Sequence, residues 1–548
     1  MIDPHVAYRA LTSRDSRFDG VFFVGVTSTG IYCRPICPVK TPQERNCRFF
    51  ASAEAAEKAS FRPCLRCRPE LAPGHAPVDR AHRIAHLLAQ RIDEGRVDEG
   101  VGLEEIAEQF QLSSRQLRRI VQQELGVSPI ELLQTRRLLL AKQLLTETTL
   151  PVTEIAFASG FSSLRRFNDA FRQQYRMPPT RLRRKAAAPA PNSASGWAPT
   201  SGRRLSAFDP ARRTAARRSA ATLRAEEGEE AARTATLQLA YRPPYDWAGM
   251  LAFLDARKIR DVEHVAEGAY LRTVRLGRQA GWIRVTQAPE RNALLVEFPR
   301  SLMPVLPTLL GRLRHLFDLT ARPDVISGHL AKDRILGRGV KQRPGLRVPG
   351  AFDGHEMALR AVLGQQITVK AATTIAGRFA EAFGRKIETP FPELTRLTPL
   401  PEQVARAGVA AIARLGIIRT RAKTLLALAR AFQAGTLRID AGADPEAAVA
   451  QLTAIPGIGP WTAHYIAMRG LRWPDAFPKE DIALRQRLGG VSAKQAEALS
   501  QAWRPWRSYA VLHLWNLNAP ASRRKRPTSN ARRSTSNGAT KVSFPEEG

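Results

Sequence analysis

Four of the five cysteines are spaced as a metal site needs them. They form two close pairs, Cys33-x3-Cys37 and Cys64-x2-Cys67, separated by a longer stretch of chain. Each pair spans one turn and offers two thiolates, and the intervening chain can fold back to complete a tetrahedral Zn²⁺ site. Spacing alone favours a purely structural zinc site, the more frequent role of four cysteines. The fifth, Cys47, lies outside both pairs and is expected in a strand or in the core.

Two neighbouring carboxylates that follow a glycine hairpin are the second candidate for chemistry. The run at 455–461 reads Ile-Pro-Gly-Ile-Gly-Pro-Trp, which predicts a tight turn between two helices. Gly457 and Gly459 allow the backbone to approach a phosphate, and the second helix begins with free N–H groups that face it. Glu480 and Asp481 come later, at the start of a further predicted helix. Capping of that helix is the structural role for either carboxylate.

The overall charge indicates a polyanionic partner. Lys and Arg number 84 against 50 Asp and Glu in 548 residues, a formal net charge of +34. Nucleic acid is the first candidate, and an anionic membrane surface is the rival. No apolar run is long enough to span a bilayer, no signal segment follows Met1, and five cysteines do not suggest a secreted disulfide framework. We expect a cytoplasmic protein that binds double-stranded DNA and no membrane.

Two helix-turn-helix units are predicted in the first third of the chain. Apolar residues recur at helical spacing over 103–110 and 117–125 around a short turn, and the pattern repeats over 152–175. Arginines take the outward positions of the second helix of each unit, where contact with DNA phosphates or simple solvation is expected. These candidate DNA-binding residues are Arg115, Arg118, Arg119, Arg165 and Arg166.

The tandem units, joined by one long predicted helix, resemble the AraC-type DNA-binding domain over roughly residues 80–185. The resemblance implies two recognition helices that enter successive major grooves of promoter DNA.

The cysteine motifs carry a resemblance of their own. Gly-Ile-Tyr-Cys-Arg-Pro-Ile-Cys at 30–37 and Phe-Arg-Pro-Cys-Leu-Arg-Cys at 61–67 are similar to the N-terminal zinc domain of Ada-type proteins of the bacterial response to DNA alkylation. The resemblance implies that Zn²⁺ is bound and that Cys33 accepts a methyl group from an alkylated DNA phosphate. It also implies that the lost negative charge strengthens promoter binding, with RNA polymerase as a further partner.

Motifs after residue 236 resemble DNA-3-methyladenine glycosylase II of the helix-hairpin-helix superfamily. They are Tyr-Arg-Pro-Pro-Tyr-Asp-Trp at 241–247, Leu-Gly-Gln-Gln-Ile-Thr-Val at 363–369, the hairpin with its following Asp, and Trp-Arg-Ser-Tyr-Ala at 506–510. The resemblance assigns Asp481 as the carboxylate that stabilises an oxocarbenium-like sugar, with Glu480 as the alternative.

The same resemblance assigns a base pocket and a DNA wedge. Phe253, Trp461, Tyr465 and Trp515 match positions whose rings stack on a cationic alkylated base, although each alone is more often a core residue. Gln366 matches the wedge that replaces the flipped base, where the family often has an apolar side chain. Trp461 stands where bifunctional relatives carry a nucleophilic Lys, so a monofunctional enzyme is expected. A Na⁺ or K⁺ on the hairpin carbonyls is also implied.

The sequence therefore predicts a multidomain protein that repairs alkylated DNA and regulates transcription. We expect a small α/β zinc domain (1–76), an all-α tandem helix-turn-helix domain (77–185), a flexible linker (186–235), an α+β domain with an antiparallel sheet (236–349), an all-α helix-hairpin-helix domain (350–520) and a disordered basic tail (521–548). The main alternative is a transcription regulator whose C-terminal half only binds DNA. A weaker alternative is an architectural protein that binds DNA through charge.

Overall fold

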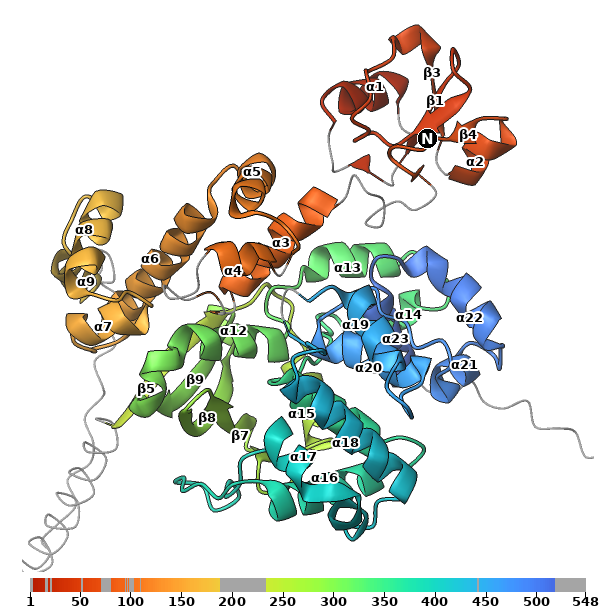
Figure 1. Ribbon diagram of the computed structural model, residues 1–548. Helices are drawn as coiled ribbons and strands as arrows, with labels where there is room; N and C mark the ends of the chain where they lie inside the picture. Colours follow the sequence, from red (N-terminus) through yellow and green to blue (C-terminus); the bar gives the residue numbers. More distant parts are fainter. Residues whose placement is uncertain are drawn as a thin grey trace, which may run out of the picture.

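The structure is a computed structural model that describes residues 3–517, apart from 70–79, 188–232 and short gaps at 15–17, 20–21, 51–52, 94, 96, 98–102, 109 and 441–442. Most of the predicted linker and all of the predicted tail lie outside the described residues. The chain is multidomain, as expected (Figure 1). No helix among the described residues is long and apolar enough to cross a membrane.

The N-terminal domain is a small four-stranded sheet with two helices. Strand order is β3-β1-β2-β4, and β2 runs parallel to β4 with Tyr32 opposite Pro63. Cys33 ends β2 and Cys64 directly follows β4, so the two cysteine pairs meet at one edge of the sheet. The elements are α1 (Pro4–Thr12), β1 (Phe23–Val26), β2 (Ile31–Cys33), β3 (Cys47–Phe50), α2 (Ala53–Lys58) and β4 (Arg62–Pro63).

The second domain is all-helical and contains the two expected helix-turn-helix units. The second helix of each unit begins at a serine cap: Ser113 accepts from the Gln116 N–H, and Ser163 accepts from the Arg166 N–H. Gly126 ends α5 with a φ of 75°, in the left-handed region that favours glycine. The helices are α3 (Arg80–Asp93), α4 (Leu103–Glu108), α5 (Ser114–Leu125), α6 (Pro129–Glu147), α7 (Val152–Ala158), α8 (Leu164–Tyr175) and α9 (Pro179–Ala187).

The third domain is built on an antiparallel sheet of order β5-β9-β8-β7-β6. Leucines of the helices pack with inward residues of β8 and β9, such as Ile283 and Val296, in one apolar core. This confirms the predicted α+β class. The elements are β5 (Thr234–Ala240), α11 (Trp247–Asp255), β6 (Glu263–Ala266), β7 (Ala269–Leu276), β8 (Gln279–Ala288), β9 (Ala293–Pro299) and α12 (Leu306–Leu316).

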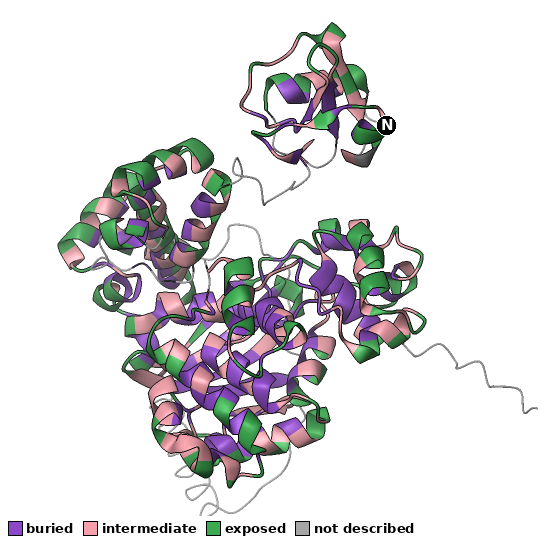
Figure 2. Ribbon diagram, turned by 45° about the vertical axis from the view of Figure 1, so that its right-hand side comes forward, coloured by how far each residue is buried: buried purple, intermediate pink, exposed green. Residues whose placement is uncertain are grey.

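The fourth domain is all-helical, and buried residues gather where its helices face one another (Figure 2). Helix α15 is its centre, because seven of its ten residues are buried. Its helices are α15 (Gly354–Leu363), α16 (Val369–Phe383), α17 (Pro401–Ala413), α18 (Arg419–Gln433), α19 (Pro445–Thr453), α20 (Pro460–Gly470), α21 (Ile482–Arg487), α22 (Ala493–Ser500) and α23 (Arg507–Asn516). Helices α13 (Pro323–Leu330) and α14 (Gly337–Gln342) precede the expected start of this domain at 350, but they pack with α23 in one apolar cluster.

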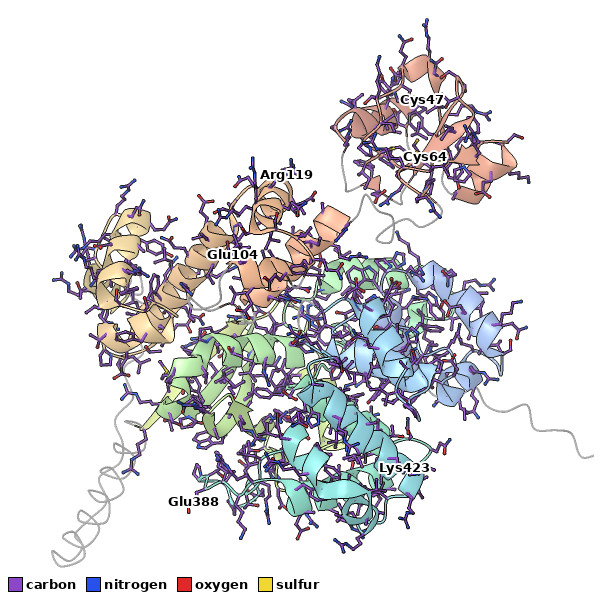
Figure 3. The ribbon with its side chains drawn as sticks, viewed as in Figure 1. Cys47, Cys64, Glu104, Arg119, Glu388 and Lys423 are labelled. Carbon is purple, nitrogen blue, oxygen red and sulfur yellow. The ribbon has the colours of Figure 1, made fainter. Side chains whose placement is uncertain are left out.

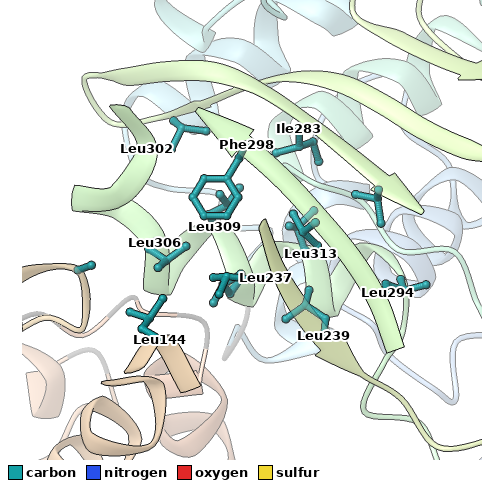
Figure 4. Close-up of a cluster of buried hydrophobic side chains, with 14 of the residues drawn as sticks. Leu144, Leu237, Leu239, Ile283, Leu294, Phe298, Leu302, Leu306, Leu309 and Leu313 are labelled. Atoms are coloured by element: carbon teal, nitrogen blue, oxygen red, sulfur yellow. The ribbon is translucent and has the colours of Figure 1, made fainter. Parts of the chain in front are cut away.

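Helix α6 of the second domain covers the free edge of β5. The Gln143 side chain donates to the Gln238 carbonyl (2.6 Å), and the Glu147 carboxylate accepts from the Gln238 N–H (3.1 Å). Leu144, between them, joins the cluster that contains Leu237 and Leu306 (Figure 4). Unpaired backbone groups on an edge strand can pair with other chains, and these contacts satisfy both backbone groups of Gln238 at that edge. The sequence does not predict this contact between the two halves.

Candidate zinc centre and active site

The four paired cysteines meet in one buried cluster. Their sulfur atoms all lie within 4.8 Å of one another, and the Cys37 and Cys64 sulfurs are 4.0 Å apart. Tetrahedral Zn²⁺ with bonds of about 2.3 Å places its sulfurs about 3.8 Å apart. Four buried thiols with sulfurs at most 4.8 Å apart are therefore close to the arrangement that Zn²⁺ requires. Cys33, Cys37, Cys64 and Cys67 are 5, 4, 7 and 0% exposed.

The electrostatics of the cluster show why a cation belongs there. Hydrogen bonds from Cys33 and Cys67 lower the pKa of Cys37 to about 2. The hydrogen bond to Cys37 raises the pKa of Cys33 far above its ordinary value. Sulfurs this close share their protons, so one thiolate forms at the expense of its neighbours. A divalent cation removes that competition, because it favours the deprotonated form of every ligand.

The sequence analysis missed a buried arginine beside the cluster. Arg34 is fully buried, and its side chain forms an ion pair with Asp19. Its backbone N–H donates to the Cys67 sulfur (3.4 Å). A hydrogen-bonded, fully buried sulfur is a poor nucleophile, so Cys67 is the least suited of the four. Its position directly after Cys33 could have indicated that Arg34 lies beside the cluster.

Cys47 is not part of the cluster. It is the first residue of β3, in agreement with the expected strand position. Its thiol donates to the Gln43 carbonyl (3.4 Å). Burial raises the pKa of its thiol to about 11. Figure 3 shows Cys47 apart from Cys64 within the domain.

The arginines predicted to meet DNA lie on the two expected helices. All five side chains are exposed, while Leu117 and Val121 of α5 and Phe167 and Phe171 of α8 are buried. Figure 3 shows Arg119 on the outer side of α5. Each helix thus has an exposed basic face and an apolar face that packs in the core. The arginines are Arg115, Arg118 and Arg119 on α5, and Arg165 and Arg166 on α8.

The glycine hairpin joins α19 to α20 and is exposed at its tip. Gly457 has a φ of 91°, and a Cβ there would lie 2.1 Å from the Thr424 hydroxyl oxygen, so only glycine fits. Gly459 caps α20, and a Cβ there would meet nothing within 4 Å. Buried Ile458 anchors the turn between them. The open side of the hairpin presents backbone to solvent, as phosphate contact requires.

The predicted wedge is connected to this hairpin through its neighbour. Gln366 is exposed in the turn after α15, and its φ of 57° is rare for residues other than glycine. The Gln365 side chain donates to the Gly457 carbonyl (2.9 Å) and to the Thr462 hydroxyl (3.0 Å). The Arg421 guanidinium donates to the Gln365 carbonyl (2.5 Å). Gln365 therefore fixes the turn that carries Gln366 against the glycine hairpin, a contact that the sequence analysis missed.

Asp481 is held by three N–H donors. It caps α21 through the Leu484 N–H (2.7 Å), and it accepts from the indole N–H groups of Trp461 (2.9 Å) and Trp515 (3.3 Å). Helix capping and placement among the aromatic rings therefore coexist. Glu480 shares none of these donors, and its Oε2 is buried without a hydrogen-bond partner. The two carboxylates are adjacent in sequence but only Asp481 faces the rings.

Three of the four predicted pocket aromatics lie together beside this carboxylate. The Trp461 and Tyr465 rings are stacked, with centroids 5.4 Å apart and planes at 9°, and the Trp515 ring is 6.2 Å from Tyr465. Phe253 joins them from α11 through Arg469, whose guanidinium lies 5.0 Å from the Phe253 ring and 5.7 Å from the Tyr465 ring. All four rings are partly exposed.

Models of four protein families match successive parts of the chain. The matches are the metal binding domain of Ada (6–70), a helix-turn-helix domain (106–185), the AlkA N-terminal domain (236–353) and the HhH-GPD superfamily of base excision DNA repair proteins (359–508). They follow the order of domains in the structure.

Three relatives extend this pattern. DNA-3-methyladenine glycosylase 2 of Escherichia coli is 38% identical over 277 residues, 50% of this chain and 95% of its own. The bifunctional transcriptional activator/DNA repair enzyme AdaA of Bacillus subtilis is 30% identical over 178 residues, 32% of this chain and 81% of its own. The probable bifunctional transcriptional activator/DNA repair enzyme AlkA of Mycobacterium tuberculosis is 39% identical over 514 residues, 93% of this chain and 95% of its own. Similar along nearly its whole length to that last relative, the chain belongs to the family of bifunctional transcriptional activator/DNA repair enzymes in which an Ada-type zinc domain precedes an AlkA-type glycosylase.

Proposed function

We propose that the chain is a DNA alkylation-response protein whose C-terminal half is a monofunctional N-glycosylase for alkylated bases such as 3-methyladenine. The observation that carries this is the Asp481 carboxylate, held by two indole N–H groups beside stacked aromatic rings and next to an exposed glycine hairpin. The N-terminal half accepts a methyl group at its zinc centre and binds promoter DNA.

Base excision follows from the residues around Asp481. Cleavage of the base–sugar bond builds positive charge on the sugar, and a fixed carboxylate beneath that carbon stabilises it. The rings of Trp461, Tyr465 and Trp515 stack on the flipped base, and a cationic alkylated purine gains most from such contacts. Gln366 fills the gap left in the duplex. Because Trp461 occupies the place of a nucleophilic Lys, the product is an abasic site and no strand is cut.

Methyl transfer is assigned to Cys33. Zn²⁺ held by Cys33, Cys37, Cys64 and Cys67 would keep their sulfurs deprotonated, and the thiolate is the nucleophilic form of cysteine. Sulfur attacks the methyl carbon, a C–S bond forms, the C–O bond breaks, and the phosphate leaves as a diester anion with the electron pair. The thiolate becomes a thioether and the domain loses one negative charge. Its repulsion from DNA falls, so repair of the phosphate strengthens promoter binding by α5 and α8.

Two finer assignments rest on the family alone. Activation through RNA polymerase, in the bacterial cytoplasm, is proposed from the regulator half. A Na⁺ or K⁺ on the hairpin is proposed from the glycosylase half, although the Pro456 and Gly457 carbonyls already accept hydrogen bonds from Thr424 and Gln365.

One incubation tests both activities. The full-length protein is mixed with chemically methylated DNA, released bases are separated by chromatography, and cysteine peptides are mapped by mass. We expect released alkylated purines together with one methyl group on Cys33. DNA binding without base release would favour the alternative, a regulator whose C-terminal half only binds DNA. A methyl group on Cys47 would contradict the assignment of the acceptor.

A further inference from the structure

A cavity of about 540 Å³ lies between the second and third domains, here called the interface cavity. Its walls include one turn of α6, from the helix-turn-helix domain, and one turn of α12, from the sheet domain (Figure 1). Sites for small molecules have volumes of this size. No residue assigned above to the zinc centre, the base pocket or DNA contact lines it. The residues of these two turns are Arg136, Arg137 and Leu140 of α6, and Leu310, Gly311 and Arg314 of α12.

Direct contacts between the two domains hold the walls of the cavity together. The Thr308 hydroxyl of α12 donates to the carbonyl of Gly95, a lining residue (2.9 Å). The two backbones are so close there that a Cβ on Gly95 would lie 2.5 Å from the Thr308 nitrogen. Gln143, which bonds to Gln238 at the edge of β5, lines the cavity as well. A ligand in the cavity would therefore touch both domains across an interface that is already formed.

The described lining carries more positive than negative charge. Asp93 is the one acid among the described lining residues, and it pairs with Arg136 (2.8 Å). Asp318 also acts on Arg472, but this carboxylate already accepts from the Tyr509 hydroxyl (2.7 Å). An anionic ligand would balance the remaining charge. The arginines that line the cavity are Arg136, Arg137, Arg314 and Arg472.

Two polar groups of the lining lack hydrogen-bond partners among the described residues. The Ser159 hydroxyl, at the end of α7, is such a group, and its residue is only 1% exposed. The Arg314 guanidinium is the other, and burial lowers its pKa. Asp93 acts on Arg314 but forms its ion pair with Arg136. Buried polar groups without partners are unfavourable, and ligand oxygens that reached them would remove that cost.

The rest of the lining is apolar. Leu139 is 46% exposed, and Pro307 and Leu310 of α12 add further apolar surface. A ligand that matches the whole cavity therefore combines an anionic group with a flat or apolar body. A nucleotide has both parts, because its phosphates are anionic and the faces of its base are apolar. A DNA duplex is too wide to enter a space of this volume, so the ligand is a small molecule.

We propose that the interface cavity binds a nucleotide, with its phosphates on the arginines and its base against the leucines, and that the bound nucleotide stabilises the docked arrangement of the two domains. Guanidinium groups pair with phosphate oxygens through strong, charge-assisted hydrogen bonds. A ligand that contacts both walls binds only the docked form, so it shifts the protein toward that form by mass action. The proposal does not depend on the glycosylase function.

Calorimetry with the full-length protein tests the recognition of the ligand, with ATP as the probe. ATP should bind at least about tenfold more tightly than adenosine, which lacks the phosphates, and than inorganic pyrophosphate, which lacks the base. Arg314→Met keeps the length of the side chain and removes its charge and donors, so ATP should bind about tenfold more weakly or worse. Arg260→Met, at an exposed arginine that pairs with Glu381, is the control and should leave the affinity unchanged.

Hydrogen exchange, read by mass spectrometry, tests the location. Saturating ATP should slow exchange of backbone amides in both α6 and α12 by about tenfold or more, because opening of the interface then requires release of the ligand. Protection of only one of the two helices, or of neither, overturns the placement between the domains.

Each outcome of these experiments decides the matter. The proposal is overturned by absence of ATP binding, by adenosine or pyrophosphate binding as tightly as ATP, or by wild-type affinity in Arg314→Met. Displacement of all bound ATP by duplex DNA also overturns it, since the arginines would then be a contact for the DNA backbone. Should Arg314→Met fail to fold by circular dichroism, the three probes and the exchange pattern of the wild-type protein decide.

Discussion

Replacing Trp461 by Phe removes one of three hydrogen bonds to the Asp481 carboxylate and little else. The indole N–H lies 2.9 Å from Oδ2, whereas the Leu484 N–H and the Trp515 indole remain on Oδ1. A Phe ring can still stack on Tyr465, whose centroid is 5.4 Å from that of Trp461. The substitution therefore separates positioning of the carboxylate from stacking on the base.

The expected loss follows from the bond that is removed. A hydrogen bond to a charged group contributes about 1.5–3 kcal/mol, which corresponds to about 10- to 150-fold. Trp461 is partly exposed, so water can replace part of the bond, and we expect about a tenfold slower release of alkylated purines. The Trp515 bond is longer, at 3.3 Å, so Trp515→Phe should cost less, about threefold.

The assay is single-turnover base release, with affinity for abasic-site DNA as the control. Affinity should stay within about twofold in both variants, because neither indole lies at the exposed tip of the hairpin, Gly457 to Gly459, where contact with the DNA backbone is expected. Release by Trp461→Phe at the wild-type rate would refute the idea that the indole positions the carboxylate. A larger loss in Trp515→Phe than in Trp461→Phe would contradict the ranking taken from the distances.

Three further predictions concern the rest of the molecule. Cys64→Ala, or removal of Zn²⁺ by a chelator, should unfold the N-terminal domain while base release persists; a domain that stays folded by circular dichroism without metal would exclude this role. Burial opposes ionisation of Tyr465, but Arg469 and Arg257 outweigh it and lower its pKa to about 8, so the phenolate forms in the folded protein at a lower pH than in the unfolded chain and should add to the free energy of unfolding as the pH rises from 8 to 10. Tyr465→Phe should abolish that pH dependence. Gln143→Ala and Glu147→Ala together should expose Gln238 at the strand edge and lower the free energy of unfolding by about 1–3 kcal/mol, measured with denaturant; an unchanged midpoint would contradict the contact between the halves.

Local patterns predicted the units of this fold well. Cysteine spacing predicted the zinc cluster, since each pair occupies a single turn. The tandem helix-turn-helix pattern was predicted correctly because the second helix of each unit buries one face and begins at a serine cap, as α5 does at Ser113. The resemblance assigned Asp481 by its place after the hairpin, and in the structure Asp481 differs from Glu480 in its hydrogen bonds.

What the sequence did not predict depends on pairs that are far apart along the chain. The Gln365 side chain meets Gly457, and Gln143 meets Gln238, through packing of whole helices that no local period encodes. Arg257, which follows α11, Arg360 of α15 and Arg469 of α20 all act on Tyr465, although each looks like an ordinary surface arginine in its own segment. Pairings of this kind follow from tertiary structure, which the sequence pattern does not specify.

The central claim is that one carboxylate drives base release, and Asp481→Asn tests it most directly. The substitution keeps the shape of the side chain and removes its charge. With protein in excess over methylated DNA, we predict that Asp481→Asn releases alkylated purines at least about 100-fold more slowly than wild type. Its affinity for abasic-site DNA should be unchanged. Release at a near wild-type rate by Asp481→Asn would contradict the account.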